Sequence, residues 1–433
     1  MLGIVFGSFV VLLFLGLPIA GSMIFSTLLP SFALENFPGN LNYILRATVS
    51  GLDTMSILAI PLFMLSGAIM AQGGISRKLF DIFAVFIGKF KAGMPCAVVV
   101  TCLFYGAISG SGPATVAAVG AMCIPVLTEL GYDRKFAAAI VATAGGLGVI
   151  IPPSIPMIMY GVTTGESVGD MFTAGIVPGV LIAASLMTYC ILYCVRHGED
   201  KERINKAVDA LRSKGYLRVI WSGIPALLTP VIILGGIYSG KATPTEAACI
   251  SVFYALFVSL CVYRTMKLSD LLSQMKSAVK SYAPICLLIA FAIAFGRVLS
   301  LLQAPALISD LLTTTFHSPY TFLIALNICM LIMGMFMDTA SAIAILGPIL
   351  LATAKSFGID GIHFGIILVT NLAVGLVSPP VGINLFVAAP LVETSAGKLG
   401  KKVLAPCAFF LLALLLITFI PQISLFLLPA HMM

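Results

Sequence analysis

The few polar residues that could do chemistry in this chain lie inside long apolar runs. Asp338 follows the residues GMFM, and an acid buried in an apolar segment costs several kcal/mol unless it meets a cation or a proton. The same residue could instead simply cap a helix that begins at Thr339. The segment 109–113 (SGSGP) adds two hydroxyls where a helix is costly to continue. Hydroxyls, freed carbonyls and one carboxylate are groups that could bind a cation.

Three further polar residues are candidates for binding. Arg297, in IAFGRVLSLL, could bind a substrate carboxylate with two hydrogen bonds. It could equally snorkel, or pair with an acid of the protein. Asn371 and Asn384 flank the pair Pro379-Pro380 and could offer amide oxygens, or they could hydrogen-bond between helices.

The composition places these residues in a membrane. The chain has 433 residues, 60% of them hydrophobic and 9% charged, with a mean hydropathy of +1.11, values that no soluble domain of this length carries. Several runs approach the ~20 apolar residues that span a bilayer, which predicts roughly a dozen membrane segments. The first run, 1–29, lacks the basic start of a signal peptide and is expected to be one retained helix.

The charge pattern predicts topology rather than nucleic-acid binding. The net charge of +7 is spread over short loops, not gathered on one face or arm. The densest run, 196–218, carries seven basic and four acidic residues and is expected to be cytoplasmic. It divides the chain into a first half, 1–195, and a second half, 219–433.

The two halves contain the same signals in the same order, which predicts an internal repeat. The matched positions are Pro95 with Pro319, Thr115 with Thr339, Pro125 with Pro348, Gly131 with Gly358, Gly148 with Gly375, and Pro152-Pro153 with Pro379-Pro380.

Each repeat begins with an apolar stretch too long for one crossing. The stretch 92–130 is interrupted at 109–113, and the stretch 319–357 is interrupted near 334–339. Both are expected to be re-entrant helical hairpins. Basic residues flank the base of the first hairpin, whereas the base of the second, flanked by His317, Lys355 and Asp360, lacks this excess. The positive-inside rule therefore predicts that the repeats are inverted.

Each hairpin is followed by a segment with a Gly/Pro interruption, 136–162 and 364–389. Proline removes a backbone donor and disfavours helical geometry in the preceding residue, so nearby carbonyls lose their helical partners. Such carbonyls are tolerated in a membrane only inside protein or facing a wet cavity. Four interruptions in related positions therefore favour a site near the midplane over ordinary helix kinks.

Several segments resemble the large membrane subunit of tripartite ATP-independent periplasmic (TRAP) transporters over almost the whole chain. They are GGIYSGKATPTEAACISVFYAL (235–256), SGSGPAT (109–115), LGVIIPPSIPMIMYGV (147–162) and NLAVGLVSPPVGINLFVAA (371–389). The resemblance implies a multi-pass protein of the bacterial inner membrane that imports a small organic anion with sodium and works as an elevator. It also implies two partners, a small four-helix membrane subunit and a periplasmic substrate-binding protein.

The resemblance further implies that sodium and substrate bind at the hairpin tips and broken helices. Matched by motif, these positions are Ser109, Gly110, Ser111, Gly112, Thr115, Gly148, Pro152, Pro153, Ser154, Gly334, Asp338, Thr339, Gly375, Ser378, Pro379, Pro380 and Gly382. The chain has SGSG where SGSS is common, and Ser378 where threonine is usual. Serine keeps the hydroxyl at that position.

Other functions fit the sequence less well. The four histidines lie in or near expected loops or ends, and Asp338 has no evident acidic partner, so intramembrane serine and aspartyl proteases lack their groups. No GxxxxGK[ST] loop is present to use ATP, and no cofactor other than sodium is expected. Inverted broken helices favour an alternating site over a channel. The remaining alternative is a stand-alone carboxylate carrier, driven by sodium or by protons through Asp338, that needs no binding protein.

Overall fold

The computed structural model describes residues 2–34, 37–72, 74–213 and 215–428, and within these ranges every regular element is helical. In chain order the elements are α1 (Leu2–Phe14), α2 (Ile19–Ala33), α3 (Leu41–Leu52), α4 (Met55–Gln72), α5 (Ile75–Ile87), α6 (Gly93–Ser109), α7 (Gly112–Glu129), α8 (Arg134–Ala144), the 3₁₀ segment η1 (Gly145–Val149), α9 (Ile155–Thr164), α10 (Val168–His197), α11 (Lys201–Ser213), α12 (Tyr216–Tyr238), α13 (Pro244–Phe257), the π-helical segment η2 (Val258–Val262), α14 (Leu268–Leu301), α15 (Ala304–Thr315), α16 (Pro319–Phe336), α17 (Thr339–Ser356), α18 (Gly361–Gly375), α19 (Ile383–Leu391), α20 (Ala396–Phe419) and α21 (Pro421–Leu425).

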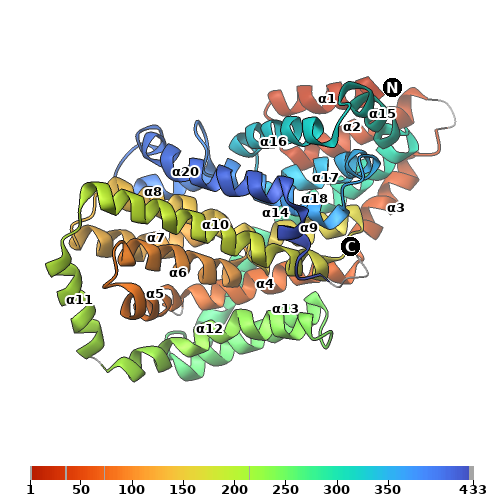
Figure 1. Ribbon diagram of the computed structural model, residues 1–433. Helices are drawn as coiled ribbons and strands as arrows, with labels where there is room; N and C mark the ends of the chain where they lie inside the picture. Colours follow the sequence, from red (N-terminus) through yellow and green to blue (C-terminus); the bar gives the residue numbers. More distant parts are fainter. Residues whose placement is uncertain (1, 35–36, 73, 214, 429–433) are drawn as a thin grey trace.

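The helices have the lengths and composition of a multi-pass membrane protein, which confirms the predicted fold class. In the described part of the chain, nine helices are long and apolar enough to cross a membrane. Shorter apolar helices include α6, α9 and α18, which belong to the interrupted elements. Figure 1 shows α10 and α20 running side by side along the molecule.

The first apolar run is not the single helix that the sequence predicts. Within its described part, α1 ends at Phe14 and α2 begins at Ile19, while Met1 lies outside the described residues. Gly16 has φ of 85°, a left-handed conformation that glycine adopts without strain. Pro18, in an extended conformation, precedes α2. A glycine and a proline so close together end one helix and start the next.

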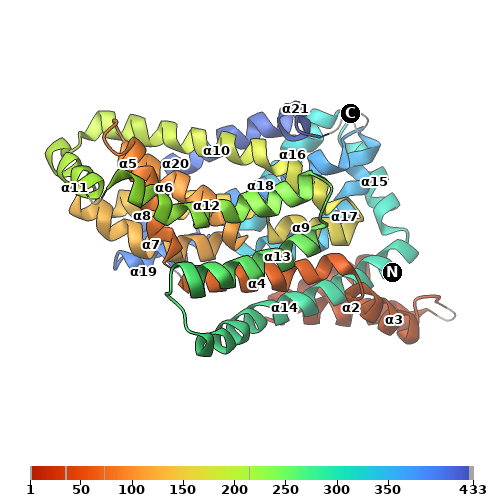
Figure 2. The ribbon, with the colours of Figure 1, turned by 90° about the horizontal axis from the view of Figure 1, so that it is seen from below.

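One group of helices forms a scaffold on one side of the molecule. Helices α4 and α13 pack along each other, α12 packs on α13, and α14 packs on α2, α3 and α4; Figure 2 shows α4, α13 and α14 together on the side opposite α10. The TPTEA motif begins α13. Thr243 and Glu246 form a reciprocal capping box there, and the Thr245 hydroxyl donates to the Met55 carbonyl at 2.8 Å. The motif therefore joins α13 to the start of α4.

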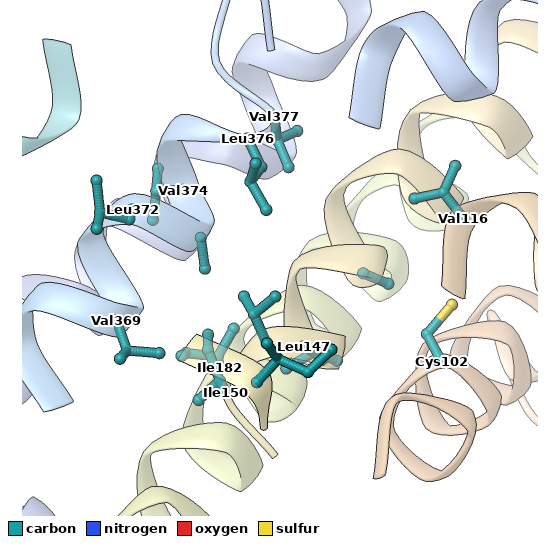
Figure 3. Close-up of a cluster of buried hydrophobic side chains, with 14 of the residues drawn as sticks. Cys102, Val116, Leu147, Ile150, Ile182, Val369, Leu372, Val374, Leu376 and Val377 are labelled. Atoms are coloured by element: carbon teal, nitrogen blue, oxygen red, sulfur yellow. The ribbon is translucent and has the colours of Figure 1, made fainter. Parts of the chain in front are cut away.

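The second group consists of the two hairpins, α6–α7 and α16–α17, and the two broken helices, α8–α9 and α18–α19. The core of this group is apolar. The buried face of η1 packs against α6, α7 and α18. Figure 3 shows Leu147 of η1, and Ile150 directly after it, between α18, which carries Val369 and Leu372, and the first hairpin. Segments of the two repeats thus meet in one core.

The charged connector holds the base of the first hairpin. Residue 214 of the predicted connector, 196–218, lies outside the described residues. The Glu199 carboxylate accepts hydrogen bonds from the Ala92 backbone N–H, at 3.1 Å to each oxygen, and from the Tyr132 hydroxyl at 2.5 Å. Ala92 precedes α6 and Tyr132 follows α7. One carboxylate therefore joins both ends of the hairpin.

Candidate functional site

A cavity of 610 Å³ lies between the tips of the two hairpins and the scaffold. The first tip contributes residues 109–111 and the second contributes residues 338–340. Helices α4 and α14 close the opposite side, and the start of α9 contributes Ile155 and Pro156. The lining is mainly apolar, with a few polar groups that converge on one space. This is the usual composition of a small-molecule site.

The first tip is built from hydroxyls around one carbonyl. Helix α6 ends at Ser109, Gly110 has φ of 63°, and Pro113 lies in the first turn of α7, where its missing N–H has no cost. The Ser111 carbonyl accepts hydrogen bonds from the Thr115 hydroxyl at 2.8 Å and from the Ser109 hydroxyl at 3.2 Å. These two hydroxyls also lie 2.9 Å apart. The tip has three oxygens within hydrogen-bond reach of one another and no charged side chain.

The first tip contacts the first broken helix through glycine. A Cβ added to Gly148 would lie 2.6 Å from the Thr115 hydroxyl and 2.7 Å from the Ser111 carbonyl oxygen. No real Cβ approaches so closely, so the sequence needs glycine here. The Ile155 N–H donates to the Gly110 carbonyl at 3.4 Å, which ties the tip to the start of α9.

A serine closes the break in the first broken helix. The peptide bond between Pro152 and Pro153 is cis, and the following Ser154 caps α9 by accepting a hydrogen bond from the Met157 N–H at 3.4 Å. The Ser154 hydroxyl donates to the Val149 carbonyl at 2.5 Å. It therefore spans the prolines and satisfies a carbonyl at the end of η1.

The second tip carries the acid. Asp338 is the N-cap of α17, and its carboxylate accepts a hydrogen bond from the Ala340 N–H at 3.0 Å. Its side chain is exposed and lines the cavity together with Thr339. The capping role and the site role considered from the sequence are therefore compatible, because capping leaves carboxylate lone pairs free.

The second broken helix contacts its hairpin through two glycines. A Cβ on Gly375 would lie 2.5 Å from both Cα and the carbonyl carbon of Gly334, so two backbones touch. The Gly382 N–H donates to the Met335 carbonyl at 3.2 Å. Ser378 donates to the Val374 carbonyl at 2.8 Å, and Pro379-Pro380 is the second cis pair. These residues lie behind the tip and do not line the cavity.

The structure separates the remaining candidates from the cavity. Arg297 lies on α14 and donates to the Ser50 hydroxyl at 2.8 Å; it is not among the residues that line the cavity. The Asn384 amide donates to the Ala142 carbonyl at 3.2 Å, and Asn371 donates to Asn327. Both asparagines donate hydrogen bonds between helices, while their side-chain oxygens have no hydrogen-bond partner among the described residues.

The family model described as "Tripartite ATP-independent periplasmic transporter, DctM component" matches residues 6–423. The chain belongs to this family.

Individual relatives agree with this membership. The isethionate TRAP transporter permease protein DctMQ of Oleidesulfovibrio alaskensis is 39% identical over 425 residues, which are 98% of this chain and 66% of that longer protein. The C4-dicarboxylate TRAP transporter large permease protein DctM of Pseudomonas aeruginosa is 41% identical over 372 residues, 86% of this chain and 85% of that one.

Among solved structures, the YdaH transporter of Alcanivorax borkumensis shares the fold. Its TM-score is 0.63 at 15% sequence identity, covering 88% of this chain and 89% of that chain. Family membership and the apolar helices make this chain a transport component and a multi-pass protein of the bacterial inner membrane. The family resemblance read from the motifs is confirmed.

Some residues of the site carry no signal in the sequence. Ser277 and Ser281 of α14 line the cavity, and they lie one helical turn apart on a single face. Tyr105 of α6 lines it as well. Two serines four residues apart would have been the only hint, and such spacing is common on any helix.

Among the described residues, no three His, Cys, Asp or Glu side chains cluster as metal ligands, so a cation here would rely on oxygens of Ser, Thr, Asp338 and the backbone.

Proposed function

We propose that this DctM-family protein imports a small organic anion together with sodium, and that the anion is delivered by a periplasmic binding protein. The observation that carries the proposal is the cavity, because it brings both hairpin tips to one space beside the scaffold. A site between two repeat-related tips is what a transporter with inverted repeats uses.

Sodium is the coupling ion that suits the tips. The first tip offers the Ser111 carbonyl and the hydroxyls of Ser109 and Thr115, which are neutral oxygen ligands. The second tip offers Asp338 and Thr339. A sodium ion at each tip organises the hairpins, and the pocket between them then accepts an anion, since the helix N-termini at α7 and α17 and the bound cations favour negative charge.

The substrate is a small organic anion. The named relatives transport isethionate and C4-dicarboxylates, which share a compact carbon skeleton with one or two acid groups; sugar acids and sialic acids are anions of the same general kind. The cavity of 610 Å³ has room for such molecules. Ser277 and Ser281 provide hydroxyls on the scaffold side.

The cavity also supports an elevator movement. Its walls come from two groups of helices, the hairpin group on one side and α4 and α14 on the other. Sliding of the hairpin group along these helices carries the cavity from one face of the membrane to the other. The hydrogen bonds of Glu199 to Ala92 and Tyr132 at the base hold the first hairpin together during such a movement.

Uptake into proteoliposomes tests the proposal. The protein is reconstituted with its small membrane subunit, and uptake of labelled isethionate, succinate, sugar acids and sialic acid is measured with and without the periplasmic binding protein. We expect uptake of one of these classes that requires both an inward sodium gradient and the binding protein. Uptake that needs no binding protein, or that follows a proton gradient in the absence of sodium, would instead support the stand-alone carboxylate carrier.

A further inference from the structure

Two asparagines form a buried amide pair behind the second hairpin. Asn371 of α18 has no exposed surface, and Asn327 of α16 is 8% exposed. The Asn371 amide nitrogen donates to the Asn327 backbone carbonyl at 3.0 Å and to the Asn327 side-chain oxygen at 2.7 Å. The Asn327 amide nitrogen donates to the Leu323 carbonyl at 2.8 Å and to the Thr418 hydroxyl at 3.4 Å.

Backbone carbonyls fix the orientation of both amides. A carbonyl can only accept a hydrogen bond, so Asn371 must present its nitrogen to the Asn327 carbonyl, and Asn327 must present its nitrogen to Leu323. The side-chain oxygen of Asn371 therefore points elsewhere, and it has no hydrogen-bond partner in the described part of the chain. An unpartnered buried acceptor costs about 1–3 kcal/mol.

The pair has acceptors left over and no donors. All four amide hydrogens are used, and the Thr418 hydroxyl donates to the Leu414 carbonyl at 2.8 Å. The oxygens of both side chains retain free lone pairs. A ligand that requires only acceptors fits this arrangement, and a small monovalent cation is such a ligand. No carboxylate takes part in the hydrogen bonds of the pair, which disfavours a divalent ion.

A second cavity lies beside Leu323 and Thr418, which are hydrogen-bond partners of Asn327, although neither asparagine lines it. This cavity, of 710 Å³, lies at the base of the second hairpin, and Thr418 lines it. Asp360 and Lys355 also line it, but Lys355 pairs with Glu166 at 2.7 Å. The Asp360 carboxylate is thus left as the excess charge at the mouth, which attracts cations.

We propose that Asn371 and Asn327 hold a sodium ion, which enters from the cavity at the base of the second hairpin. This inference rests on the proposed function. It adds an internal ion position one helical turn before Gly375, where α18 touches Gly334 of the hairpin. An ion there would stabilise the contact between the second hairpin and its broken helix before the ion moves on to the tip.

The test is sodium-dependent thermal unfolding of the full chain in detergent, with sodium chloride exchanged for choline chloride at constant ionic strength. The variants are Asn371→Asp, which adds a charge to the same shape, and Asn371→Leu, which removes the oxygen. We expect Asn371→Asp to lower, about tenfold, the half-saturating sodium concentration of one component of the sodium-dependent rise in Tm. We expect Asn371→Leu to lose that component. Thr101→Val is the matched control, because it removes a buried hydroxyl that only bonds the Ala97 carbonyl of its own helix.

The outcomes separate this inference from the proposed function. If the amides only join helices or hold a water molecule, both Asn371 variants will lower the Tm equally in sodium and in choline and keep the half-saturating concentration of the wild type, which overturns the inference alone. If the losses of sodium-dependent Tm rise caused by Asn371→Leu and by the tip variant Thr115→Val add in the double variant, two separate ion positions are supported. If Asn371→Leu does not fold, Asn371→Asp decides the question. A wild type without any sodium response overturns both proposals.

Discussion

The two hairpin tips face the same cavity but are built differently. The first is neutral, with the hydroxyls of Ser109 and Thr115 arranged around the Ser111 carbonyl. The second carries Asp338, whose carboxylate caps α17 and lines the cavity. A neutral tip can stay hydrogen-bonded within itself when empty, whereas the acid of the second tip needs a cation or a proton when water is excluded. In the proposed function, the second tip therefore depends more strongly on a bound ion than the first.

The tips also differ in how they meet their broken helices. Gly148 is close to a hydroxyl and a carbonyl oxygen of the first tip, whereas Gly375 touches the backbone of Gly334 directly. The Thr115 hydroxyl could rotate away from a methyl group added to Gly148, but the Ser111 backbone carbonyl could not. At Gly375 all three nearest atoms are backbone atoms of Gly334, which cannot separate without moving a helix. Both positions therefore need glycine, and the contact at Gly375 is made entirely by backbone.

The largest expected effect comes from Gly375→Ala. Because the new Cβ would lie 2.5 Å from Gly334 backbone atoms, we expect uptake to be lost and the free energy of unfolding to fall by about 2 kcal/mol. Proteoliposome uptake and thermal unfolding measure the two effects. Gly235→Ala is the control, since no atom lies within 4 Å of its added Cβ, and it should retain activity. Equal retention of uptake and stability by Gly375→Ala and Gly235→Ala would contradict the close backbone contact at Gly375.

Asp338→Asn should have the next largest effect, and on transport rather than on stability. Asparagine caps helices about as well as aspartate does, so the Tm in choline should stay within about 2 °C of the wild type. Loss of the negative charge should reduce sodium-driven uptake at least about tenfold. If the variant unfolds easily in choline but transports normally once folded, capping would be the main role of Asp338.

Thr115→Val should have a smaller effect at the neutral tip. The substitution keeps the shape but removes the hydroxyl that donates to the Ser111 carbonyl. We expect the sodium concentration that gives half-maximal uptake to rise about threefold to fivefold, because the carbonyl and the Ser109 hydroxyl remain as ligands. An uptake loss as large as that of Asp338→Asn would remove the distinction between the tips.

The smallest expected effect comes from Glu199, at the base of the first hairpin. Burial alone would raise the pKa of the Glu199 carboxyl, but hydrogen bonds from Tyr132 and the Ala92 N–H and the pairing with Lys201 hold this pKa below its usual value. A lowered folded-state pKa means that the stabilisation is present above the ordinary glutamate pKa of about 4.3 and is lost as the pH falls through the lower folded-state value.

We therefore expect the Tm of the wild type to fall as the pH drops below about 4.5, and Glu199→Gln to have a lower Tm at pH 7 and a flatter pH profile. Thermal unfolding between pH 7 and pH 3.5 measures this difference. The control is Glu202→Gln, whose glutamate is exposed and pairs only with the exposed Lys206. Parallel profiles of Tm against pH for the wild type and Glu199→Gln would show that the interactions of the Glu199 carboxylate contribute nothing to stability.

The sequence predicted the interruption of each hairpin because its cause is local. Gly110 and Pro113 mark the first hairpin turn, and the structure ends α6 at Ser109 and begins α7 at Gly112. The break between α1 and α2 was missed because Gly16 and Pro18 lie in a run that is otherwise apolar without interruption, and length alone favoured one helix.

The missed parts of the site depend on tertiary contacts. Asn327 is one polar residue in an apolar helix, and only the packing of α16 on α18 brings it to Asn371. Ser277 and Ser281 reach the cavity because α14 passes beside the hairpin tips. Arg297 attracted attention as a charge in an apolar run, yet its partner is Ser50 of α3, which no local pattern predicts.

Thermal unfolding of the wild type and of Asp338→Asn, in sodium chloride and in choline chloride, measures whether sodium binds at the hairpin tips as proposed. A ligand that binds only the folded state stabilises it by about 2.7 kcal/mol at a hundredfold excess over Kd. We expect a rise in Tm that is specific to sodium in the wild type and smaller in Asp338→Asn. Coincident sodium and choline curves, with stabilisation of the wild type but not the variant at low pH, would contradict it and point to proton coupling through Asp338.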